Sequence, residues 1–252
     1  MIVSLDFHAH IDPAIPIHDL DRLESCIVAV TRTTNDYKTT LSRPHPSTLW
    51  AVGAHPSLAT VHKRFDKSEF EAALSRTAIV GEVGLDGRSS ASLELQLRTL
   101  NAIFEATSRR PRLMTVHSSF ATMALLEVLE HRRPRGVVLH WWSGDQEQTK
   151  RALDLGCYFS INFAQTRNPS IVDILPADRV LTETDHPFGD RLQPGLRLPG
   201  VVAEVEKYLA KSWSMDIQTT RRQIWQNLKV LATSTQTLDM LPRDFQATLL
   251  SL

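Results

Sequence analysis

Eight short runs of apolar, largely β-branched residues recur along most of this chain, and segments with helical spacing separate them. The runs are 2–7, 25–31, 48–53, 78–83, 113–116, 136–139, 157–161 and 179–182. Most of them are almost continuously apolar, as strands are when both of their faces are buried. Alternation of strand and helix predicts parallel β/α units, and eight such units predict closure into a barrel.

The segments between these runs carry apolar residues three and four positions apart, a spacing that lines one face of a helix. We expect helices over 67–76, 92–109, 119–132 and 145–155, and helical structure over about 201–252. Two predicted apolar stripes comprise Leu93, Leu97, Leu100 and Phe104, and Phe120, Met123, Ala124, Leu126 and Leu129. The 252 residues suit one barrel, and no linker or repeat indicates a second domain. The prediction is a single α/β domain, a TIM (β/α)8 barrel over residues 1–252 with C-terminal helices.

Charge and cysteine content argue against several classes of protein. Lys plus Arg and Asp plus Glu number 28 each, so no broad basic surface is expected, although a local basic rim could still attract phosphates. Cys26 and Cys157 lie within apolar runs, which indicates buried thiols in a reducing compartment. The chain opens without a basic leader, and no apolar run approaches the roughly 18 residues of a membrane span. We therefore expect a soluble, cytoplasmic protein without a membrane partner.

Two histidines follow the first apolar run, in the sequence Asp6-Phe7-His8-Ala9-His10. Because side chains alternate along a strand, His8 and His10 leave the same face, about 7 Å apart on an extended chain. Two imidazoles on one face at the carboxyl end of a strand make half of a metal site. Taken alone the pair is a weak signal, since a structural role explains it equally well.

Four more potential metal ligands stand at the ends of other predicted strands. Glu82 is a lone carboxylate in an apolar run, where burial without a cation would cost several kcal/mol. His117 ends the fifth run, His140 ends the sixth, and Asp185 follows the eighth. In a β/α barrel these ends meet at one mouth, where active sites are built. Convergence of four histidines and two carboxylates favours a metal site over separate structural roles.

Six short motifs, in this order, resemble those of the TatD-related metal-dependent deoxyribonucleases of the amidohydrolase superfamily. The resemblance covers residues 1 to about 190. The motifs are Asp6-x-His8-x-His10, Gly53-x-His55-Pro56, Gly81-Glu82-Val83-Gly84-Leu85-Asp86, His117, His140-x-x-Ser143-Gly144 and Glu183-Thr184-Asp185-x-Pro187. Singly none is specific, but together they are. The resemblance implies a barrel that cleaves phosphodiesters with divalent metals, often trimming single-stranded DNA from its 3′ end.

By position, the resemblance implies two divalent metal ions and six ligands. It assigns His8, His10 and Asp185 to one metal, His117 and His140 to the other, and Glu82 to a bridge between them. A carboxylate can bridge two cations about 3.5–4 Å apart, and such a pair holds both the attacking and the leaving oxygen of a phosphoryl transfer. Asp185 is also expected to act as general base, so Asp185 and Glu82 are the predicted catalytic residues. Mixed imidazole and carboxylate ligands suit Zn, Mn and, less well, Mg.

The other polar residues near the strand ends are expected to have supporting or surface roles. Asp6, His55 and Glu183 should orient the ligands without binding metal. The remaining histidines outside the strand ends, expected at the surface, are His18, His45, His62 and His131.

The chain departs from the family pattern in the loops that surround the mouth. The family often has an Arg two residues after the histidine of the fifth strand, whereas here Ser118 and Ser119 follow it. An aromatic residue commonly follows Gly-Leu-Asp, whereas here Gly87 and Arg88 follow. Arg88 or Arg191 could supply the missing phosphate contact, and both are candidate substrate-binding residues. Two basic clusters are expected as solvated surface at the opposite end of the barrel: Arg109, Arg110 and Arg112, and Arg132, Arg133 and Arg135.

We predict a divalent-metal-dependent phosphodiesterase that acts on DNA, a 3′-end-directed exonuclease on single strands. A small-molecule amidohydrolase or lactonase would use the same cations, but that class usually carries a Lys at a strand end, and none occurs between Lys67 and Lys150. A third hypothesis is a barrel that serves mainly as a binding component of a larger assembly. The shortened loops also resemble compact TatD-like proteins of bacterial Qat-type anti-phage systems, which would imply a protein partner. The sequence does not indicate the oligomeric state.

Overall fold

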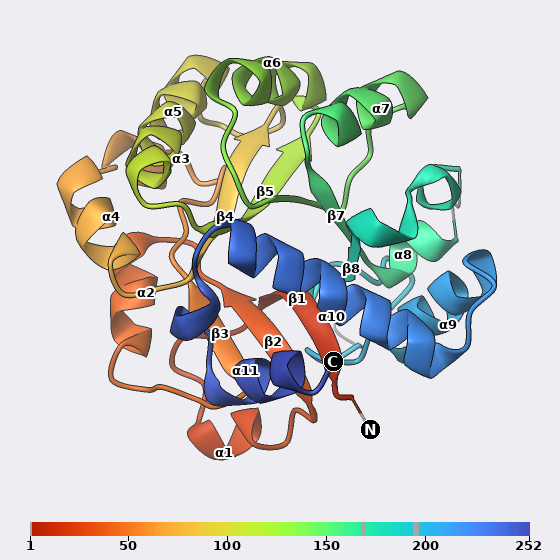
Figure 1. Ribbon diagram of the computed structural model, residues 1–252. Coiled ribbons are helices and arrows are strands. Elements are labelled where there is room, and N and C mark those ends of the chain that lie inside the picture. Colours follow the sequence, from red (N-terminus) through yellow and green to blue (C-terminus); the bar gives the residue numbers. More distant parts are fainter. Residues whose placement is uncertain (1, 168–169, 194–196) are drawn as a thin grey trace.

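The computed structural model describes residues 2–167, 170–193 and 197–252, and it has the expected barrel architecture (Figure 1). Its eight strands are β1 (Ser4–His10), β2 (Ser25–Val30), β3 (Thr48–Ala51), β4 (Ile79–Asp86), β5 (Leu113–Ser119), β6 (Val137–His140), β7 (Tyr158–Ile161) and β8 (Val180–Thr182). All paired strands are parallel, in the order β1-β2-β3 and β4-β5-β6-β7-β8.

Backbone hydrogen bonds join these two groups of strands at both seams. Beside β3 and β4, the N–H of Gly81 donates to the carbonyl of Val52 at 2.9 Å. Beside β8 and β1, the N–H of Asp185 donates to the carbonyl of His8 at 2.8 Å. The strands therefore close into a barrel, and both seams lie next to residues expected in the metal site.

Helices surround the strands and cover one end of the barrel (Figure 1). They are α1 (Ile17–Leu20), α2 (Thr34–Thr40), α3 (Ala59–Lys63), α4 (Lys67–Leu74), α5 (Leu93–Arg109), α6 (Thr122–Arg132), α7 (Gln146–Asp154), α8 (Phe163–Thr166), α9 (Ala203–Ser212), α10 (Ile217–Ser234) and α11 (Arg243–Leu250). Three short 3-10 helices are η1 (Val172–Ile174), η2 (Ala177–Arg179) and η3 (Leu238–Met240).

Helix α10 packs across the amino-terminal ends of β1 and β8. The indole N–H of Trp225 donates to the carbonyl of Val3 at 2.7 Å, and the side-chain amide of Asn227 donates to the carbonyl of Val180 at 2.7 Å. Trp225 is fully buried, as expected of a packing residue. Because α10 covers this end, the carboxyl ends of the strands form the accessible mouth.

The strands β1, β4 and β5 extend further toward the mouth than the apolar runs indicate. Strand β1 runs on to His10, β4 to Asp86 and β5 to Ser119. Polar residues end an apolar run in the sequence, but here they continue the ladder, because their side chains point into the mouth instead of the core. Five of the potential ligands therefore sit on strands, with register shifts around His8 and Glu82, whereas Asp185 follows β8.

The predicted apolar stripes are wrong at their amino-terminal ends, where the apolar side chains are exposed. Phe120 and Met123 are 68% and 48% exposed, and Leu93 is 41% exposed. Helix α6 begins only at Thr122, and Phe120 lies in the preceding turn with a φ of 51°. That left-handed backbone directs Phe120 away from the face that α6 buries.

Three residues expected at the surface are buried instead. His45 lies 3.0 Å from the Thr48 hydroxyl through Nδ1, and the Nε2–H of His62 donates to the carbonyl of Pro56 at 3.0 Å. Arg112 donates to the carbonyl of Leu74 at 3.2 Å. Each side chain completes the hydrogen bonding of a nearby loop or strand end, a role that residue type alone does not reveal.

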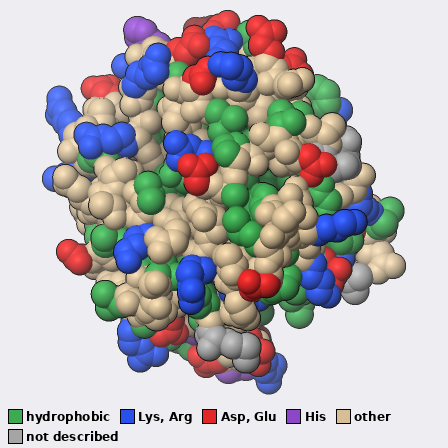
Figure 2. Space-filling model, turned by 45° about the vertical axis from the view of Figure 1, so that its right-hand side comes forward, with side chains coloured by type: hydrophobic (Ala, Val, Ile, Leu, Met, Phe, Trp, Pro, Cys, Tyr) green, Lys and Arg blue, Asp and Glu red, His purple; other side chains and the backbone are tan. Residues whose placement is uncertain are grey.

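Charge is mixed over the surface. On the face shown in Figure 2, Lys and Arg side chains are interspersed with Asp and Glu and form no patch of one sign. Cys26 and Cys157 are buried and free, as expected. No helix in the described part of the chain is long and apolar enough to span a bilayer.

Candidate metal centre

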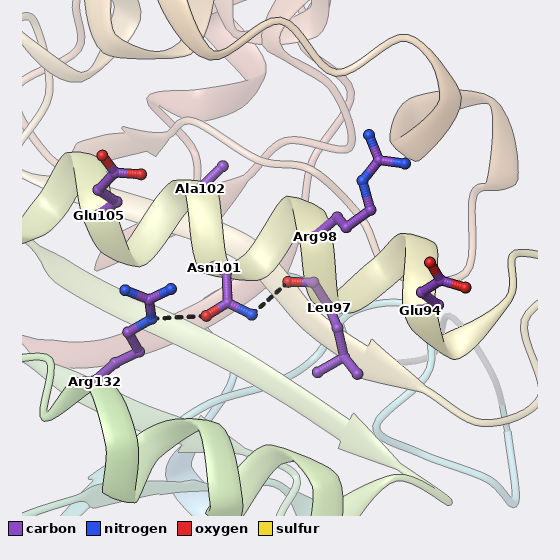
Figure 3. Close-up of a pocket in the computed structure, with 7 residues that line it drawn as sticks. All are labelled: Glu94, Leu97, Arg98, Asn101, Ala102, Glu105 and Arg132. Carbon is purple, nitrogen blue, oxygen red and sulfur yellow. Dashed lines mark hydrogen bonds between the residues drawn. The ribbon is translucent and has the colours of Figure 1, made fainter.

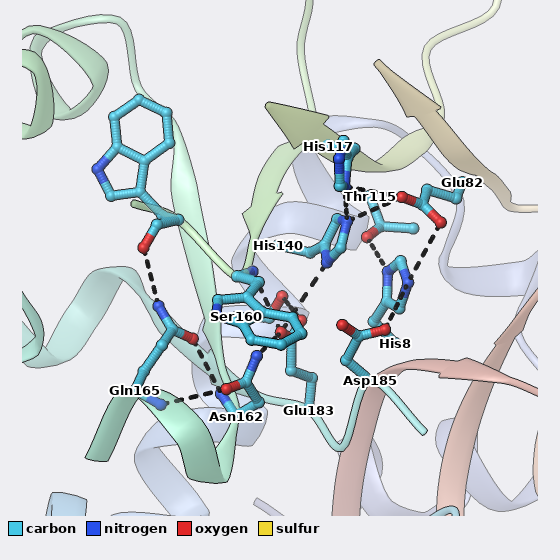
Figure 4. A network of polar contacts seen from close by, with 12 residues as sticks. His8, Glu82, Thr115, His117, His140, Ser160, Asn162, Gln165, Glu183 and Asp185 are labelled. Atoms are coloured by element: carbon cyan, nitrogen blue, oxygen red, sulfur yellow. Dashed lines mark hydrogen bonds and ion pairs between the residues drawn. The ribbon is translucent and has the colours of Figure 1, made fainter. Parts of the chain in front are cut away.

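Glu82, on β4, lies among imidazoles at the mouth of the barrel (Figure 4). Its Oε1 is 2.9 Å from His117 Nδ1 and 3.0 Å from His140 Nε2. Its Oε2 is 2.9 Å from His55 Nε2 and 3.2 Å from His10 Nε2. The Glu82 side chain is only 2% exposed. One buried carboxylate thus meets nitrogens from β1, β5, β6 and the connection after β3.

Asp185 and His8 form the adjoining part of the cluster. Asp185 Oδ1 is 3.7 Å from His8 Nε2 and 3.6 Å from His10 Nε2. The other nitrogen of His8, Nδ1, is 2.6 Å from the Thr115 hydroxyl, and its ring stacks on that of His140 with centroids 3.9 Å apart. These contacts turn His8 Nε2 toward the carboxylates. The structure therefore brings together all six side chains expected to bind metal.

Three groups of ligand atoms are each compact enough to surround a cation, with all atoms of a group within 4.8 Å of one another. They are His8, His10 and Asp185; His8, Glu82 and His140; and His10, His55 and Glu82. The first is the set expected for one metal. The set expected for the other, His117 and His140 with Glu82, is not among these groups of described residues, and Glu82 instead joins His8 and His140 or His10 and His55. The third includes His55, which was expected only to orient ligands. The sequence indicated a supporting role for His55. In the structure, however, His55 Nε2 lies 2.9 Å from Glu82 Oε2, the same distance that separates His117 Nδ1 from Glu82 Oε1.

Several buried atoms of this cluster have no hydrogen-bond partner among the described residues. They are Glu82 Oε2, His117 Nε2, His140 Nδ1 and Asp185 Oδ1. Such atoms are rare in folded proteins because leaving them unpaired is costly. Glu82 Oε2 is unpaired even though His55 Nε2 is 2.9 Å away, because the two groups are not aligned as donor and acceptor. Glu82 Oε2 and Asp185 Oδ1 each lie within 4 Å of both His8 Nε2 and His10 Nε2, and unpaired oxygens beside imidazole nitrogens fit a divalent cation.

The electrostatics around His8, His140 and Glu82 favour the forms that bind metal, whereas the Glu82 carboxylate raises the pKa of His117 against the effect of burial. Burial and the neighbouring His140 lower the pKa of His8 well below its ordinary value, and burial lowers the pKa of His140 to about 4. Burial alone would raise the pKa of Glu82, but the surrounding imidazoles, His55 first among them, hold it well below its usual range. At neutral pH the two histidines are uncharged and Glu82 is ionised, as ligands must be.

Asp185 has the opposite environment. Burial, followed by the negative charges of Glu183 and Glu82, raises the pKa of Asp185 well above its ordinary value. A carboxylate with a raised pKa is a stronger proton acceptor when it is ionised. The repulsion between buried carboxylates would also be relieved by a cation between them.

Asp6 ties the first strand to the segment that carries Asp185. It accepts hydrogen bonds from the backbone N–H and the hydroxyl of Thr184, at 2.8 and 2.6 Å, and from the N–H of Gly200 at 2.8 Å. Burial raises the pKa of Asp6 to about 6, although these hydrogen bonds lower it. Asp6 contacts no ligand atom of the cluster in these interactions, which fits the expected supporting role.

Glu183 holds the backbone that follows His140. It accepts hydrogen bonds from the N–H of Trp141 at 3.1 Å, from the Asn162 side-chain amide at 3.0 Å and from the Ser160 hydroxyl. Ser160 and Asn162 were not among the residues predicted from the sequence. The sequence feature that could have indicated them is their position, as two polar residues at the end of the seventh apolar run.

Two residues at the mouth adopt left-handed backbone conformations. The φ angles are 41° at Trp141 and 45° at Asp185. Non-glycine residues persist in this region only where their surroundings fix them, and such residues gather at functional sites. Here the hydrogen bond from Trp141 to Glu183 and the bond from Asp185 to the carbonyl of His8 supply that constraint.

The two arginines expected to bind substrate stand against aromatic rings. The guanidinium carbon of Arg191 is 4.8 Å from the centre of the Trp141 ring, and that of Arg88 is 3.6 Å from the centre of the Phe120 ring. Arg191 lines a hollow of about 160 Å³ that reaches His117 and His140. Arg88 is not among the described residues that line it. The geometry therefore favours Arg191 over Arg88 as a contact next to the cluster.

Other hollows differ in their relation to this cluster. One of about 460 Å³ borders His10 and is lined by Asp12, Arg32 and Phe188, so the mouth is open on both sides of the centre. Another lies on the outer face of α5 and α6, with residues such as Asn101 lining it (Figure 3). Its lining contains no histidine or cysteine. The mouth is therefore the candidate functional site.

Comparison with known proteins agrees with this geometry. The model of the family described as TatD related DNase matches residues 5–232. The chain belongs to this family. It is 30% identical over 165 residues to the 3′-5′ ssDNA/RNA exonuclease TatD of Edwardsiella piscicida, covering 59% of this chain and 62% of that protein. It is 27% identical over 148 residues to the uncharacterized metal-dependent hydrolase YjjV of Escherichia coli K12, covering 54% and 57%.

Solved structures share the fold over nearly the whole chain. The crystal structure of the TatD homologue YjjV from Escherichia coli K12 superposes with a TM-score of 0.80 at 23% identity, covering 92% of this chain and 98% of that one. A TatD family hydrolase from Entamoeba histolytica gives a TM-score of 0.73 at 13% identity, covering 91% and 97%. In sequence, by contrast, the match spans only about 62% of the length of the first curated relatives.

Proposed function

We propose that this TatD-family chain is a divalent-metal-dependent phosphodiesterase that removes nucleotides from the 3′ end of single-stranded DNA. The observation that carries the proposal is the arrangement of Glu82, whose two oxygens face separate imidazoles while Asp185 and His8 stand beside it. Family membership supports phosphodiester chemistry, and the relatives named as 3′-5′ ssDNA/RNA exonucleases support the substrate and polarity.

Two cations would occupy the cluster. His8, His10 and Asp185 would hold one of them, and His117 and His140 the other, with Glu82 shared. Bound there, the pair would supply the positive charge that activates water and stabilises the phosphorane-like charge of phosphoryl transfer. The unpaired Glu82 Oε2 and Asp185 Oδ1 support this assignment, because both atoms face the cluster without a partner.

The side chains of the protein would move the proton. Asp185, whose pKa is raised by burial and by Glu183, is placed to accept a proton from the attacking water. Its position depends on Asp6, which holds the backbone of the preceding Thr184. The tight backbone around Asp185 would keep its carboxylate at one position relative to Glu82.

The mixed surface charge suits a substrate held by a few phosphates near the centre. Each phosphate that a protein neutralises on a single strand contributes about −0.7 to the slope of log K against log salt. With no patch of one sign on the face in Figure 2, we expect a shallow slope. A site that offers few phosphate contacts favours a free strand end over the middle of a long strand.

A small-molecule amidohydrolase would use the same cations on a carbonyl carbon. That alternative has less support, because no Lys is among the described residues that contact the cluster or line the two hollows beside it. The expected role in an anti-phage assembly and the cytoplasmic location remain predictions of the sequence.

The proposed activity is tested with metal-loaded protein and single-stranded DNA labelled at one end. We expect stepwise release of nucleotides from linear strands, inhibition by a blocked 3′ terminus, and no comparable effect of a blocked 5′ terminus. Circular single strands of the same sequence should resist. Circular DNA cut as fast as linear DNA would contradict end-directed cleavage, and hydrolysis of dihydropyrimidine or lactone substrates alone would favour the amidohydrolase alternative.

A further inference from the structure

Two consecutive tryptophans at the end of β6 have different environments. Trp142 is 2% exposed, and its indole N–H donates to the Thr149 hydroxyl at 2.8 Å. Trp141 is only partly buried and forms part of the wall of the hollow that reaches His117 and His140. A partly exposed indole that lines a polar hollow has an aromatic surface available to a ligand.

The backbone of Trp141 is fixed in this orientation. It has a φ of 41°, and its N–H donates to the buried carboxylate of Glu183 at 3.1 Å. The residue directly follows His140, whose Nε2 is 3.0 Å from Glu82. The indole is therefore held next to the metal centre by the same carboxylate that supports the centre.

Arg191 stands on this indole and lines the same hollow. Its guanidinium carbon is 4.8 Å from the centre of the Trp141 ring. The neighbouring carboxylate, Asp190, is 3.1 Å from Arg197 and 4.0 Å from Arg167, and no carboxylate in the described part of the chain forms an ion pair with Arg191. Among the described residues Arg191 thus has no carboxylate partner, and its guanidinium lies over an aromatic face with its charge available to a ligand.

The rest of the hollow is lined with hydroxyl groups. Ser118, Ser119 and Ser143 contribute to its wall, and its volume is about 160 Å³. It therefore combines an aromatic face, a cation and small polar groups within a space that suits one nucleotide unit. Planar bases stack on indole and guanidinium groups, and phosphate and sugar oxygens bond arginine and hydroxyls.

We propose that Trp141 and Arg191 form a stacking site for the base of the terminal nucleotide of a single strand. This inference rests on the proposed nuclease function and names the residues that would hold the strand end beside the metals. Because every base has a π-face, the site should prefer a base over no base but discriminate little among the four. It would draw the terminal nucleotide into the hollow and leave the adjoining phosphate at the cluster.

The test compares two oligonucleotides that differ only in the terminal residue, one ending in a thymidine and one in an abasic sugar. Binding is measured by fluorescence anisotropy, and cleavage is measured as kcat/KM. For the unmodified chain we expect the terminal base to raise both the binding affinity and kcat/KM by about 10- to 100-fold, the range for one stacked base. In Trp141→Ala this preference should fall to about twofold, whereas Trp141→Phe should keep most of it.

Arg191→Ala should lose part of the preference, and Arg98→Ala, an exposed arginine on the outer face of α5, should behave like the unmodified chain. Thermal unfolding of each variant checks that it folds. If Trp141→Ala does not fold, Arg191→Ala still decides the question. A terminal-base preference that is absent from the unmodified chain, or unchanged in Trp141→Ala and Arg191→Ala, would overturn the stacking site.

The two readouts separate this inference from the proposed function. Trp141-dependent binding of strand ends without any cleavage would overturn the nuclease proposal and support the stacking site. Cleavage of linear strands with equal rates on both oligonucleotides would overturn the site and support the nuclease. A metal-loaded protein that neither binds nor cleaves single strands would overturn both.

Discussion

His140 Nε2 and Glu82 Oε1 lie 3.0 Å apart, so the carboxyl ends of β6 and β4 meet at one carboxylate. These strands are not neighbours, because β5 lies between them. The contact therefore joins two strands that β5 separates. It places Glu82 where its loss would affect every other member of the cluster.

Glu82→Gln should remove hydrolysis and most bound metal. The amide keeps the size of the side chain but removes the charge that faces both sets of ligands, so two cations would repel each other across the site. We expect a rate loss at least as large as that of a lost general base, about 10²- to 10⁴-fold or more. Elemental analysis of the purified variant, alongside its rate, checks this. Full metal content with a normal rate would contradict the bridging role.

Asp185→Asn should retain metal better than Glu82→Gln but still lose activity. It keeps one oxygen ligand and removes the proton acceptor, a loss that typically costs about 10²- to 10⁴-fold in rate. Asp19→Asn is the matched control, since Asp19 lies on α1 and pairs with Arg22 at 3.1 Å. The measurement is turnover at saturating metal. Near-normal turnover of Asp185→Asn with metal bound would show that another group takes the proton.

The barrel could be predicted because its main signal is local. Continuous apolar runs record burial on both faces of a strand, and eight of them allow few other folds. The clustering of the six expected ligand side chains could also be predicted, since each stands at or near the end of such a run. Their approach within a few ångströms of Glu82 follows from closure of the barrel, which places all carboxyl ends at one mouth.

The remaining roles depend on contacts between distant segments, which residue types do not reveal. His62 reads as a surface histidine, yet it is buried because a loop carbonyl, that of Pro56, needs its hydrogen bond. The support of Glu183 by Ser160 and Asn162 likewise requires knowing that β7 and β8 are adjacent. The partial exposure of Trp141 beside a buried Trp142 results from one left-handed residue.

His55 should matter to metal binding more than a residue outside the cluster does. Its Nε2 is 2.9 Å from Glu82 Oε2, so His55→Gln should lower metal affinity at least about tenfold, the lower end for residues that orient ligands. His45→Gln is the matched control, because His45 is also buried but bonds Thr48 near the start of β3. Calorimetric titration of chelated protein with Mn or Zn gives both affinities. Equal affinities in the two variants would remove His55 from the centre.

The stability of the protein should depend on pH through His62. Burial lowers the pKa of His62, because a proton added at its unpaired Nδ1 would be a buried charge. The unfolded chain, with the ordinary pKa of 6.5, then binds that proton more tightly, so this contribution is complete above pH 6.5 and is lost as the pH falls toward the folded-state pKa. The free energy of unfolding, measured in urea between pH 7 and 5, should thus decline less steeply in His62→Gln than in the unmodified chain.

The control for this pH dependence is His18→Gln, because the His18 side chain is 70% exposed. The free energy of unfolding of His18→Gln should decline between pH 7 and 5 as steeply as that of the unmodified chain. Identical pH dependence in all three proteins would show that His62 titrates alike in the folded and unfolded states.

The central claim is that the cluster around Glu82 binds two divalent cations that phosphodiester cleavage requires. The most direct measurement titrates exhaustively chelated protein with Mn or Zn and records bound metal and cleavage of labelled linear single-stranded DNA in the same samples. We predict no cleavage without metal and a rate that rises as the metal content approaches two ions per chain. Undiminished cleavage by protein in which elemental analysis detects no metal would contradict the account.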